Sequence, residues 1–263
     1  MGNRSTQIMT TDRVNKSTTV YVGIREVIMF WMFSTAFAIP TLEFVTDSGV
    51  RYSEVESHVE FQQWIESLTT IGVPPSPNAE KAFWINVYNG LTIDTVADAY
   101  PISSIRDLEG GKVWTTGTFT VSNQAITLDN IEKIRLAKFK DPRIHAALNC
   151  AAKGCPTLLS APYDAKILDQ QLNSASQQWI RDNGVRWEAG WFGNTLYLNR
   201  IFDWYATDFP CTEALPVPAF VPKKYCGAIQ FIAEHNTEYR DILYSNTYAI
   251  ELIEYDWSLN DVR

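Results

Sequence analysis

The sequence is poor in the residues and motifs that most reactive sites use. It holds three histidines and four cysteines in 263 residues, with no Cys-x-x-Cys pair of the kind found in zinc and redox motifs. It also lacks a phosphate-binding loop, a dinucleotide fingerprint, His-Glu-x-x-His and Gly-x-Ser-x-Gly, so no cofactor is predicted. Basic charge is not in excess either: the net charge is −8, which gives no electrostatic sign of nucleic-acid binding.

Residues 1–38 have the pattern of a leader segment. Basic residues precede an uncharged run that starts at Val27 and ends in Ala36-Phe37-Ala38, a small-x-small cleavage pattern. Because the run is too short for a stable membrane span, we expect a signal peptide and a secreted or periplasmic protein. Two alternatives stay open: a buried structural element, or a cytoplasmic protein myristoylated at Gly2.

Residues 39–263 are predicted to form a single α+β domain. The chain is 46% apolar and 13% aromatic, enough to build a sizeable core. The segment 80–100 is apolar nearly all around a helical circumference, which predicts a buried central helix that ends before Pro101. Short helices and strands follow without a regular βαβ repeat, so we expect this helix to pack on a mostly antiparallel sheet.

Local patterns predict the elements around that helix. A hairpin should turn near Ser122-Asn123, and Thr127 should cap the following helix. The segment 143–150 reads as a strand, and strands are also expected to start near Asn194 and in the C-terminal segment. In the segment 165–183, one apolar stripe predicts a helix; its members are Leu168, Leu172, Ala175 and Trp179.

The even number of cysteines predicts two disulfides in an exported protein. Cys211 and Cys226 flank a proline-rich segment without periodicity, where a bridge would stabilise the chain by about 2–4 kcal/mol. The other two cysteines lie close together in "RIHAALNCAAKGCPTL", residues 143–158, which also contains His145.

That segment supports three interpretations. On a strand, His145 and Asn149 would share one face, and a turn at Gly154 would return Cys155 toward His145 or toward Cys150. The first interpretation is a thiol-dependent hydrolase or acyl transferase: His145 is the base, Cys155 or Cys150 the nucleophile, and Asn149 or Asp256 the orienting group.

The other two interpretations use the same residues differently. His145, Cys150 and Cys155 would supply three ligands to a metal ion, but their spacing matches no zinc signature, so no metal is predicted. Alternatively, Cys150 and Cys155 form a structural pair in a non-enzymatic binding or scaffold module, and His145 is a hydrogen-bonded core residue.

Several polar and aromatic residues are further candidates for binding. Asn86 and Asn89 lie three positions apart on the central helix, where they either brace neighbouring loops or line a pocket together with Trp84. Acidic residues surround Trp204 in "FDWYATDF" and Trp257 in "YDWSLND". Carboxylates beside aromatic rings suggest a third function, a glycan-active protein, so the unknown substrate would be a peptide or a glycan.

Five sequence blocks carry a resemblance to a known family. They are "AFWINVYNGLTI", "SIRDL", "DPRIHAALNCAAKGCPTL", "LYLNRIFDWYATDF" and "YDWSLN", and they span about residues 79–260. In this order they resemble domain-of-unknown-function family number 547. The resemblance implies a fold near the papain and transglutaminase-like proteins by analogy, and members of the family often carry export signals.

The resemblance also bears on the candidate site. The residues that match family motifs are Asn86, Asn89, His145, Asn149, Cys150, Cys155 and Asp256. The central helix has no cysteine at its start, unlike papain-like enzymes, which weakens the case for protease chemistry. Family members often read Ile-Glu-His where this chain has Ile131-Glu132-Lys133, so any role of that histidine is absent here.

Overall fold

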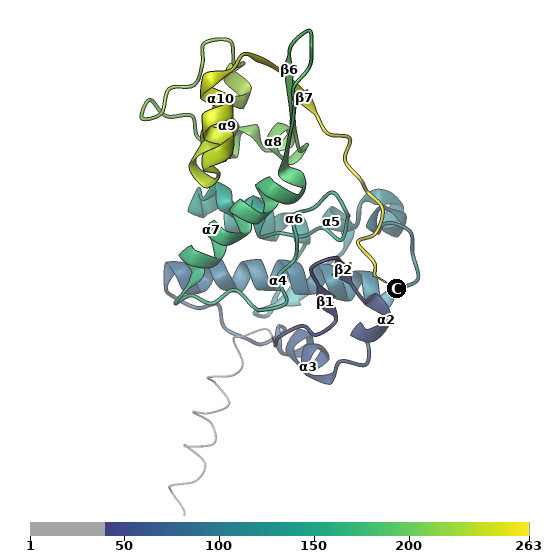
Figure 1. Ribbon diagram of the computed structural model, residues 1–263. Coiled ribbons are helices and arrows are strands. Elements are labelled where there is room, and N and C mark those ends of the chain that lie inside the picture. The colour runs from purple at the N-terminus through teal and green to yellow at the C-terminus, as the bar shows by residue number, and fades with distance from the viewer. Residues whose placement is uncertain (1–39, 263) are drawn as a thin grey trace, which may run out of the picture. The chain divides into compact units, whose positions relative to one another are not determined.

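A 22-residue helix, α4 (Pro77–Asp98), forms the centre of the larger of two hydrophobic cores. It is buried on all sides over most of its length, as its continuous apolar pattern predicts. The computed structural model describes residues 40–262, which belong to one compact unit (Figure 1). The predicted leader, its cleavage pattern and Gly2 lie outside the described residues. No helix among residues 40–262 is long and apolar enough to cross a membrane.

Short helices and three small sheets complete the described part of the chain. The other α-helices are α2 (Tyr52–Val55), α3 (Val59–Ser67), α5 (Val113–Thr116), α6 (Leu128–Asn130), α7 (Leu168–Trp179), α8 (Ile201–Trp204), α9 (Cys226–His235) and α10 (Thr237–Ser245). The strands are β1 (Val45–Thr46), β2 (Gly49–Val50), β3 (Phe119–Val121), β4 (Gln124–Ile126), β5 (Val185–Glu188), β6 (Asn194–Leu198) and β7 (Tyr248–Leu252).

The three-stranded sheet has the order β5-β6-β7. Strands β5 and β6 pair antiparallel, with Val185 opposite Leu198, whereas β6 and β7 pair parallel, with Asn194 opposite Tyr248. Parallel neighbours need a long crossover, and here the crossover contains α9 and α10, which lie to one side of β6 and β7 (Figure 1). The expected strands near Asn194 and in the C-terminal segment are therefore confirmed.

Two clusters of buried side chains form the core. The first surrounds α4 and includes Trp84 and Leu128, and the second joins α7 and α9 to the three-stranded sheet and includes Phe202. Helix α7 connects them: Leu168 and Leu172 belong to the first cluster, whereas Ala175 and Trp179 belong to the second. All four residues of the predicted α7 stripe are buried.

The α+β class is confirmed, but the surroundings of the central helix differ from the expectation. Helix α4 packs against α2, α3, α6 and the π-helical turn η2 (Ile131–Leu136). The three-stranded sheet belongs to the second core, not to the cluster around α4. The short strand segments in the sequence are too few to cover a helix of 22 residues, so other helices bury most of its surface.

Local chemistry confirms three further predictions. Ser122 and Asn123 adopt φ values of +53° and +59° at the turn of the β3–β4 hairpin. The hydroxyl oxygen of Thr127 accepts a hydrogen bond from the Asn130 N–H and so caps α6. Cys211 and Cys226 form the expected disulfide.

The predicted strand at residues 143–150 is wrong. Residues Pro142–Ala146 form a 3₁₀ turn, η4. Pro142 has no N–H to give to a strand ladder, and the Asp141 carboxylate accepts from the Arg143 N–H, which caps the turn instead. The alternating faces on which the placement of His145 beside Asn149 depended therefore do not exist.

Candidate functional site

Six aromatic side chains enclose a cavity of about 350 Å³. They are Tyr88, Trp114, Trp204, Tyr205, Tyr255 and Trp257. Tyr88 comes from α4, in the first core, whereas Tyr255 belongs to the second core, so the cavity lies where the two cores meet. We name this space the aromatic cavity.

The rings of the aromatic cavity support one another. Trp204 and Trp257 are stacked with their centroids 5.7 Å apart, and Trp114 meets Trp257 edge-on at 5.9 Å. Tyr255 packs against both Trp204 and Trp257, at 4.9 Å and 4.7 Å. Trp204 is 46% exposed, so the cavity presents an accessible aromatic face. Contacts of this kind hold the rings in place before any ligand arrives.

The two nearby cysteines form a disulfide in the cavity wall. The Tyr255 hydroxyl lies 3.2 Å from Sγ of Cys155 and 3.4 Å from Sγ of Cys150. The chain between them turns at Ala151, whose φ is +61°, and again at Lys153-Gly154, where the Cys155 N–H donates to the Ala152 carbonyl. The expected turn at Gly154 is therefore present, and a Cβ at this glycine would lie 3.0 Å from the Tyr255 ring.

His145 lies on the border between the aromatic cavity and a second hollow. Its Nε2 is 3.0 Å from a carboxylate oxygen of Asp208, and its ring lies 4.4 Å from that of Tyr205. The second hollow, of about 670 Å³, shares Glu132, His145, Trp204 and Tyr205 with the aromatic cavity. We name it the adjoining cleft.

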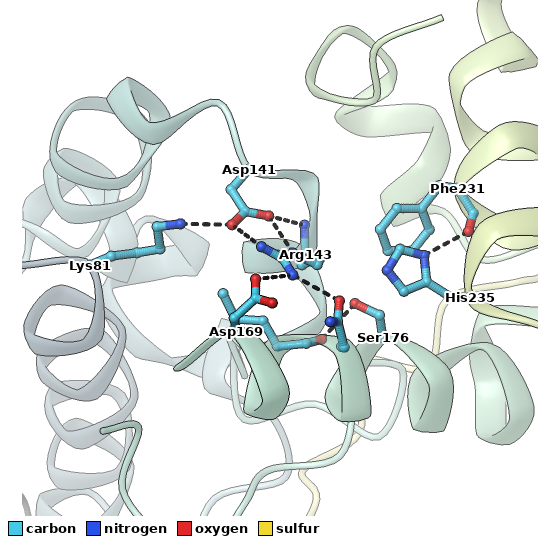
Figure 2. Close-up of polar contacts among 9 residues, drawn as sticks. Lys81, Asp141, Arg143, Asp169, Ser176, Phe231 and His235 are labelled. Atoms are coloured by element: carbon cyan, nitrogen blue, oxygen red, sulfur yellow. Dashed lines mark hydrogen bonds and ion pairs between the residues drawn. The ribbon is translucent and has the colours of Figure 1, made fainter. Parts of the chain in front are cut away.

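An ion network fixes the turn that carries His145. Asp141 accepts from Lys81 of α4 at 2.7 Å and from Arg143, which also reaches Asp169 of α7 at 2.7 Å (Figure 2). Burial opposes ionisation of Asp141, yet its hydrogen bonds with Arg143 and Lys81 hold its pKa below the ordinary value. The network therefore ties η4 to both long helices and sets the position of His145.

Glu132 is the carboxylate that faces both hollows. It lies in η2, a single π-helical turn, and such turns are frequent at functional sites. Burial raises the pKa of Tyr205, and the charge and hydrogen bond of Glu132 raise it further. Within the described residues, no lysine, arginine or histidine forms an ion pair with Glu132.

Two residues that were predicted to orient His145 form hydrogen bonds with other groups. The Asn149 side chain donates to the Pro156 carbonyl and accepts from the Ala151 N–H, so it does not orient His145. Asp208 contacts the imidazole in its place. Asp256 is exposed, accepts from the N–H and hydroxyl of Ser258, and does not line either hollow. Within the described residues, neither Asn149 nor Asp256 forms a hydrogen bond with His145, and their orienting roles stay predictions.

Of the four predicted binding residues, only Trp204 reaches the aromatic cavity. Asn86 donates to the carbonyl and accepts from the N–H of Tyr163, and Asn89 links the Ala147 carbonyl to the Asn149 N–H. Both amides brace loops, which was one of the two expected roles. Trp84 is 2% exposed in the first core and does not line the aromatic cavity.

The bridge changes the chemistry expected of the cysteines. The described residues contain no free cysteine, so neither Cys155 nor Cys150 provides the thiolate that a nucleophile or a zinc ligand must be. His145 and both sulfurs line the same cavity. Their arrangement agrees with the structural pair of the alternative interpretation.

Sequence reasoning missed most of the cavity. Tyr88, Trp114, Tyr205 and Tyr255 were not selected, and Glu132 was noted only beside the histidine that this chain lacks. The family motif at Ile131-Glu132-Lys133 was the available signal for Glu132. The aromatic residues gave none, because buried rings are usually packing residues.

The comparisons with known proteins give one match. Residues 75–180 match the family model described as "Protein of unknown function, DUF547", which confirms the resemblance over that segment. The matched segment contains Glu132, His145 and the Cys150–Cys155 bridge, whereas Trp204 and Tyr255 lie beyond it. No curated protein and no solved structure matches the chain.

Proposed function

We propose that this chain, whose residues 75–180 carry the DUF547 match, is a non-enzymatic module that binds a small organic molecule in the aromatic cavity. The observation that carries the proposal is the cavity itself: about 350 Å³, walled by six aromatic side chains and backed by a closed disulfide. This volume falls at the lower end of the range of ligand sites, about 300–1,000 Å³.

The arrangement of the six rings favours a ligand-binding role over a role in packing the core. Buried aromatic residues normally fill the interior at close-packed density, whereas these six rings leave space between them. Contacts between Trp204, Tyr255 and Trp257 hold the rings in position, so little conformational entropy is lost when a ligand enters.

Export is proposed together with this function. All four cysteines are paired, in the bridges Cys150–Cys155 and Cys211–Cys226. Disulfides persist in oxidising compartments, which supports the secreted or periplasmic location that residues 1–38 suggested.

The test uses the oxidised full-length protein and the indole N–H signals of its tryptophans in NMR spectra. The probes are small aromatic, aliphatic, sugar and cationic molecules. We expect at least one of them to shift the indole N–H signals of Trp204 and Trp257. Thr115→Trp should abolish these shifts, because Thr115 lines the cavity and a bulky ring there blocks it.

Thr116→Trp is the matched control. Thr116 is the exposed neighbour of Thr115, both hydroxyls donate to the Lys112 carbonyl, and Thr116 does not line the cavity. Its variant should bind like the unmodified protein. The proposal is wrong if no probe shifts the cavity tryptophans, or if Thr115→Trp binds as well as Thr116→Trp.

A second candidate is the thiol-dependent hydrolase or acyl transferase, favoured by the position of His145 and both sulfurs on one cavity. It requires the Cys150–Cys155 pair to be reduced, so that His145 activates a thiol. Intact mass before and after reduction, together with iodoacetamide labelling against pH, separates the two functions. Two bridges and no labelling support the binding module, whereas an acidic thiol that labels in the native protein supports the enzyme.

A glycan-active protein is the third candidate, because Trp204 and Trp257 offer stacked ring faces. A sugar-array screen tests it directly, and a blank array removes it.

A further inference from the structure

We infer that the ligand of the aromatic cavity carries an alkylated ammonium group, an inference that rests on the proposed binding function. The electrostatic sign of the wall is the starting observation. Among the described residues that line the cavity, the charged groups are Asp129 and Glu132, and there is no lysine or arginine. Negative charge beside aromatic ring faces attracts a cation and disfavours an anion.

Several hydrogen-bonding groups of the wall already have partners within the protein. The Tyr255 hydroxyl contacts the two sulfurs, His145 contacts Asp208, and Thr115 donates to the Lys112 carbonyl. A sugar, whose hydroxyl groups each need a partner, could not use these groups without breaking their present contacts. An alkylated ammonium group needs none, because its charge interacts with ring faces and its methyl groups with apolar surface.

Glu132 provides the charge that is left for a ligand. Asp129 is paired with Lys133 at 2.6 Å, so its charge is largely compensated within the protein. Glu132 forms no ion pair with a basic residue among residues 40–262, although its charge adds to the hydrogen bond with Asp129 in raising the pKa of Lys133. One carboxylate beside aromatic rings matches one positive charge. Because Glu132 and Trp204 also line the adjoining cleft, the rest of the ligand would extend into it.

The fold already contains a cation over one of these rings. The guanidinium carbon of Arg106 lies 5.2 Å from the centroid of the Trp257 ring. Since Arg106 does not line the cavity, this contact is part of the protein and leaves the ligand space unoccupied. The Trp257 ring therefore already takes part in one cation–π contact within the protein.

The experiment compares choline with 3,3-dimethyl-1-butanol, its uncharged isostere of the same shape, by calorimetric titration of the oxidised full-length protein. We expect choline to bind about tenfold more tightly, the effect of a desolvated cation–π site with a nearby carboxylate. Tetramethylammonium should compete with choline, and added salt should weaken choline binding but not dimethylbutanol binding.

Two pairs of variants locate the effect. Glu132→Gln should weaken choline about tenfold and leave dimethylbutanol unchanged, whereas Glu66→Gln, an exposed glutamate on α3, should change neither. Trp204→Leu should weaken both probes, and Trp191→Leu, a fully exposed tryptophan outside the cavity, should weaken neither. The comparison of choline with dimethylbutanol uses the unmodified protein, so its result does not depend on whether any variant folds.

The outcomes separate this inference from the proposed function. Equal affinity for choline and dimethylbutanol, or binding of neutral aromatic probes alone, overturns the ammonium inference and leaves the binding module intact. Absence of binding by every probe overturns both.

Discussion

The hydroxyl oxygen of Tyr255 lies 3.2 Å from Sγ of Cys155, so the disulfide holds a ring of the cavity wall from behind. The same ring rests on Gly154, where a side chain would collide with it. The bridge, which lines the aromatic cavity itself, and the glycine behind the Tyr255 ring therefore both shape this space.

The contribution of the Tyr255 ring to the free energy of unfolding can be measured separately from that of its hydroxyl group. We expect Tyr255→Phe to lower the free energy of unfolding by less than about 1 kcal/mol, because sulfur is a weak acceptor. Tyr255→Ala should cost about 3 kcal/mol, since it removes a large, 9% exposed side chain from the second core. Urea unfolding measures both. Equal losses for the two variants would contradict the assignment of the ring as the main contributor.

The ion network behind His145 gives a prediction that depends on pH. The folded-state pKa of Asp141 is lowered, so its contribution to stability is present above the unfolded-state pKa, near 3.9, and is lost as pH falls through the folded value. Asp141→Asn should therefore lower the unfolding free energy by about 3 kcal/mol at pH 7 and much less near pH 2.

The control for Asp141 lies in the same network. Asp169 also pairs with Arg143, but its side chain is 76% exposed, so Asp169→Asn should cost less than about 1 kcal/mol. Urea unfolding of both variants across pH is the measurement. If Asp169→Asn is as destabilising as Asp141→Asn, the stability that the ion network provides does not depend on the burial of the Asp141 carboxylate.

Asp94 on α4 should give the opposite dependence of stability on pH from Asp141. Burial and the neighbouring charge of Asp98 raise its pKa to about 6. With a raised folded-state pKa, the stability contribution is present below about pH 4 and is lost as pH rises through 6. Asp94→Asn should therefore raise the unfolding free energy by about 1 kcal/mol at pH 7.5, after allowance for its partial exposure, and change little at pH 3.5.

Asp98 provides the comparison for Asp94. Asp98→Asn removes the neighbouring charge but leaves the Asp94 carboxyl in place, so its gain in stability at pH 7.5 should be smaller. A stabilisation by Asp94→Asn that is equally large at pH 3.5 would show that ionisation is not its cause.

The sequence predicted the elements whose signals are local. The stripe of α7 requires only a helical period, and the Thr127 cap requires only the next three residues. The segment 143–150 was misread because its apolar run suggested a strand, whereas the Asp141-Pro142 pair before it ends such a pattern and starts a turn. Here the capping chemistry outweighed the apolar pattern.

Only part of the candidate site could be predicted from the sequence, and the reason is physical. His145 and the cysteines stood out because these residue types are rare in the chain. The aromatic cavity combines residues as distant as Tyr88 and Trp257, and nothing local distinguishes a ring that lines a space from one that fills it. Only the meeting of two cores decides which rings remain uncovered.

Gly227 gives a final prediction that links the second core to His145. A Cβ at Gly227, in the first turn of α9, would lie 1.9 Å from the Phe209 carbonyl oxygen. Phe209 follows Asp208 in the chain, and its ring lies 5.5 Å from that of His145. Gly227→Ala must therefore shift the backbone that supplies the partner of His145, and we expect a loss of about 2 kcal/mol or more in unfolding free energy.

Gly72→Ala is the matched substitution, because a Cβ at Gly72 would meet nothing within 4 Å. It should be neutral or stabilise the protein by up to about 1 kcal/mol, through the reduced entropy of the unfolded chain. Urea unfolding gives the stabilities, and NMR titration of the Asp208 carboxyl reports the pair, because its hydrogen bond with His145 holds the pKa of Asp208 below the ordinary value. In Gly227→Ala the pKa of Asp208 should rise as its contact with His145 is disturbed, whereas in Gly72→Ala it should not change. An unchanged Asp208 pKa in a destabilised Gly227→Ala protein would show that α9 supports the core without positioning the His145–Asp208 pair.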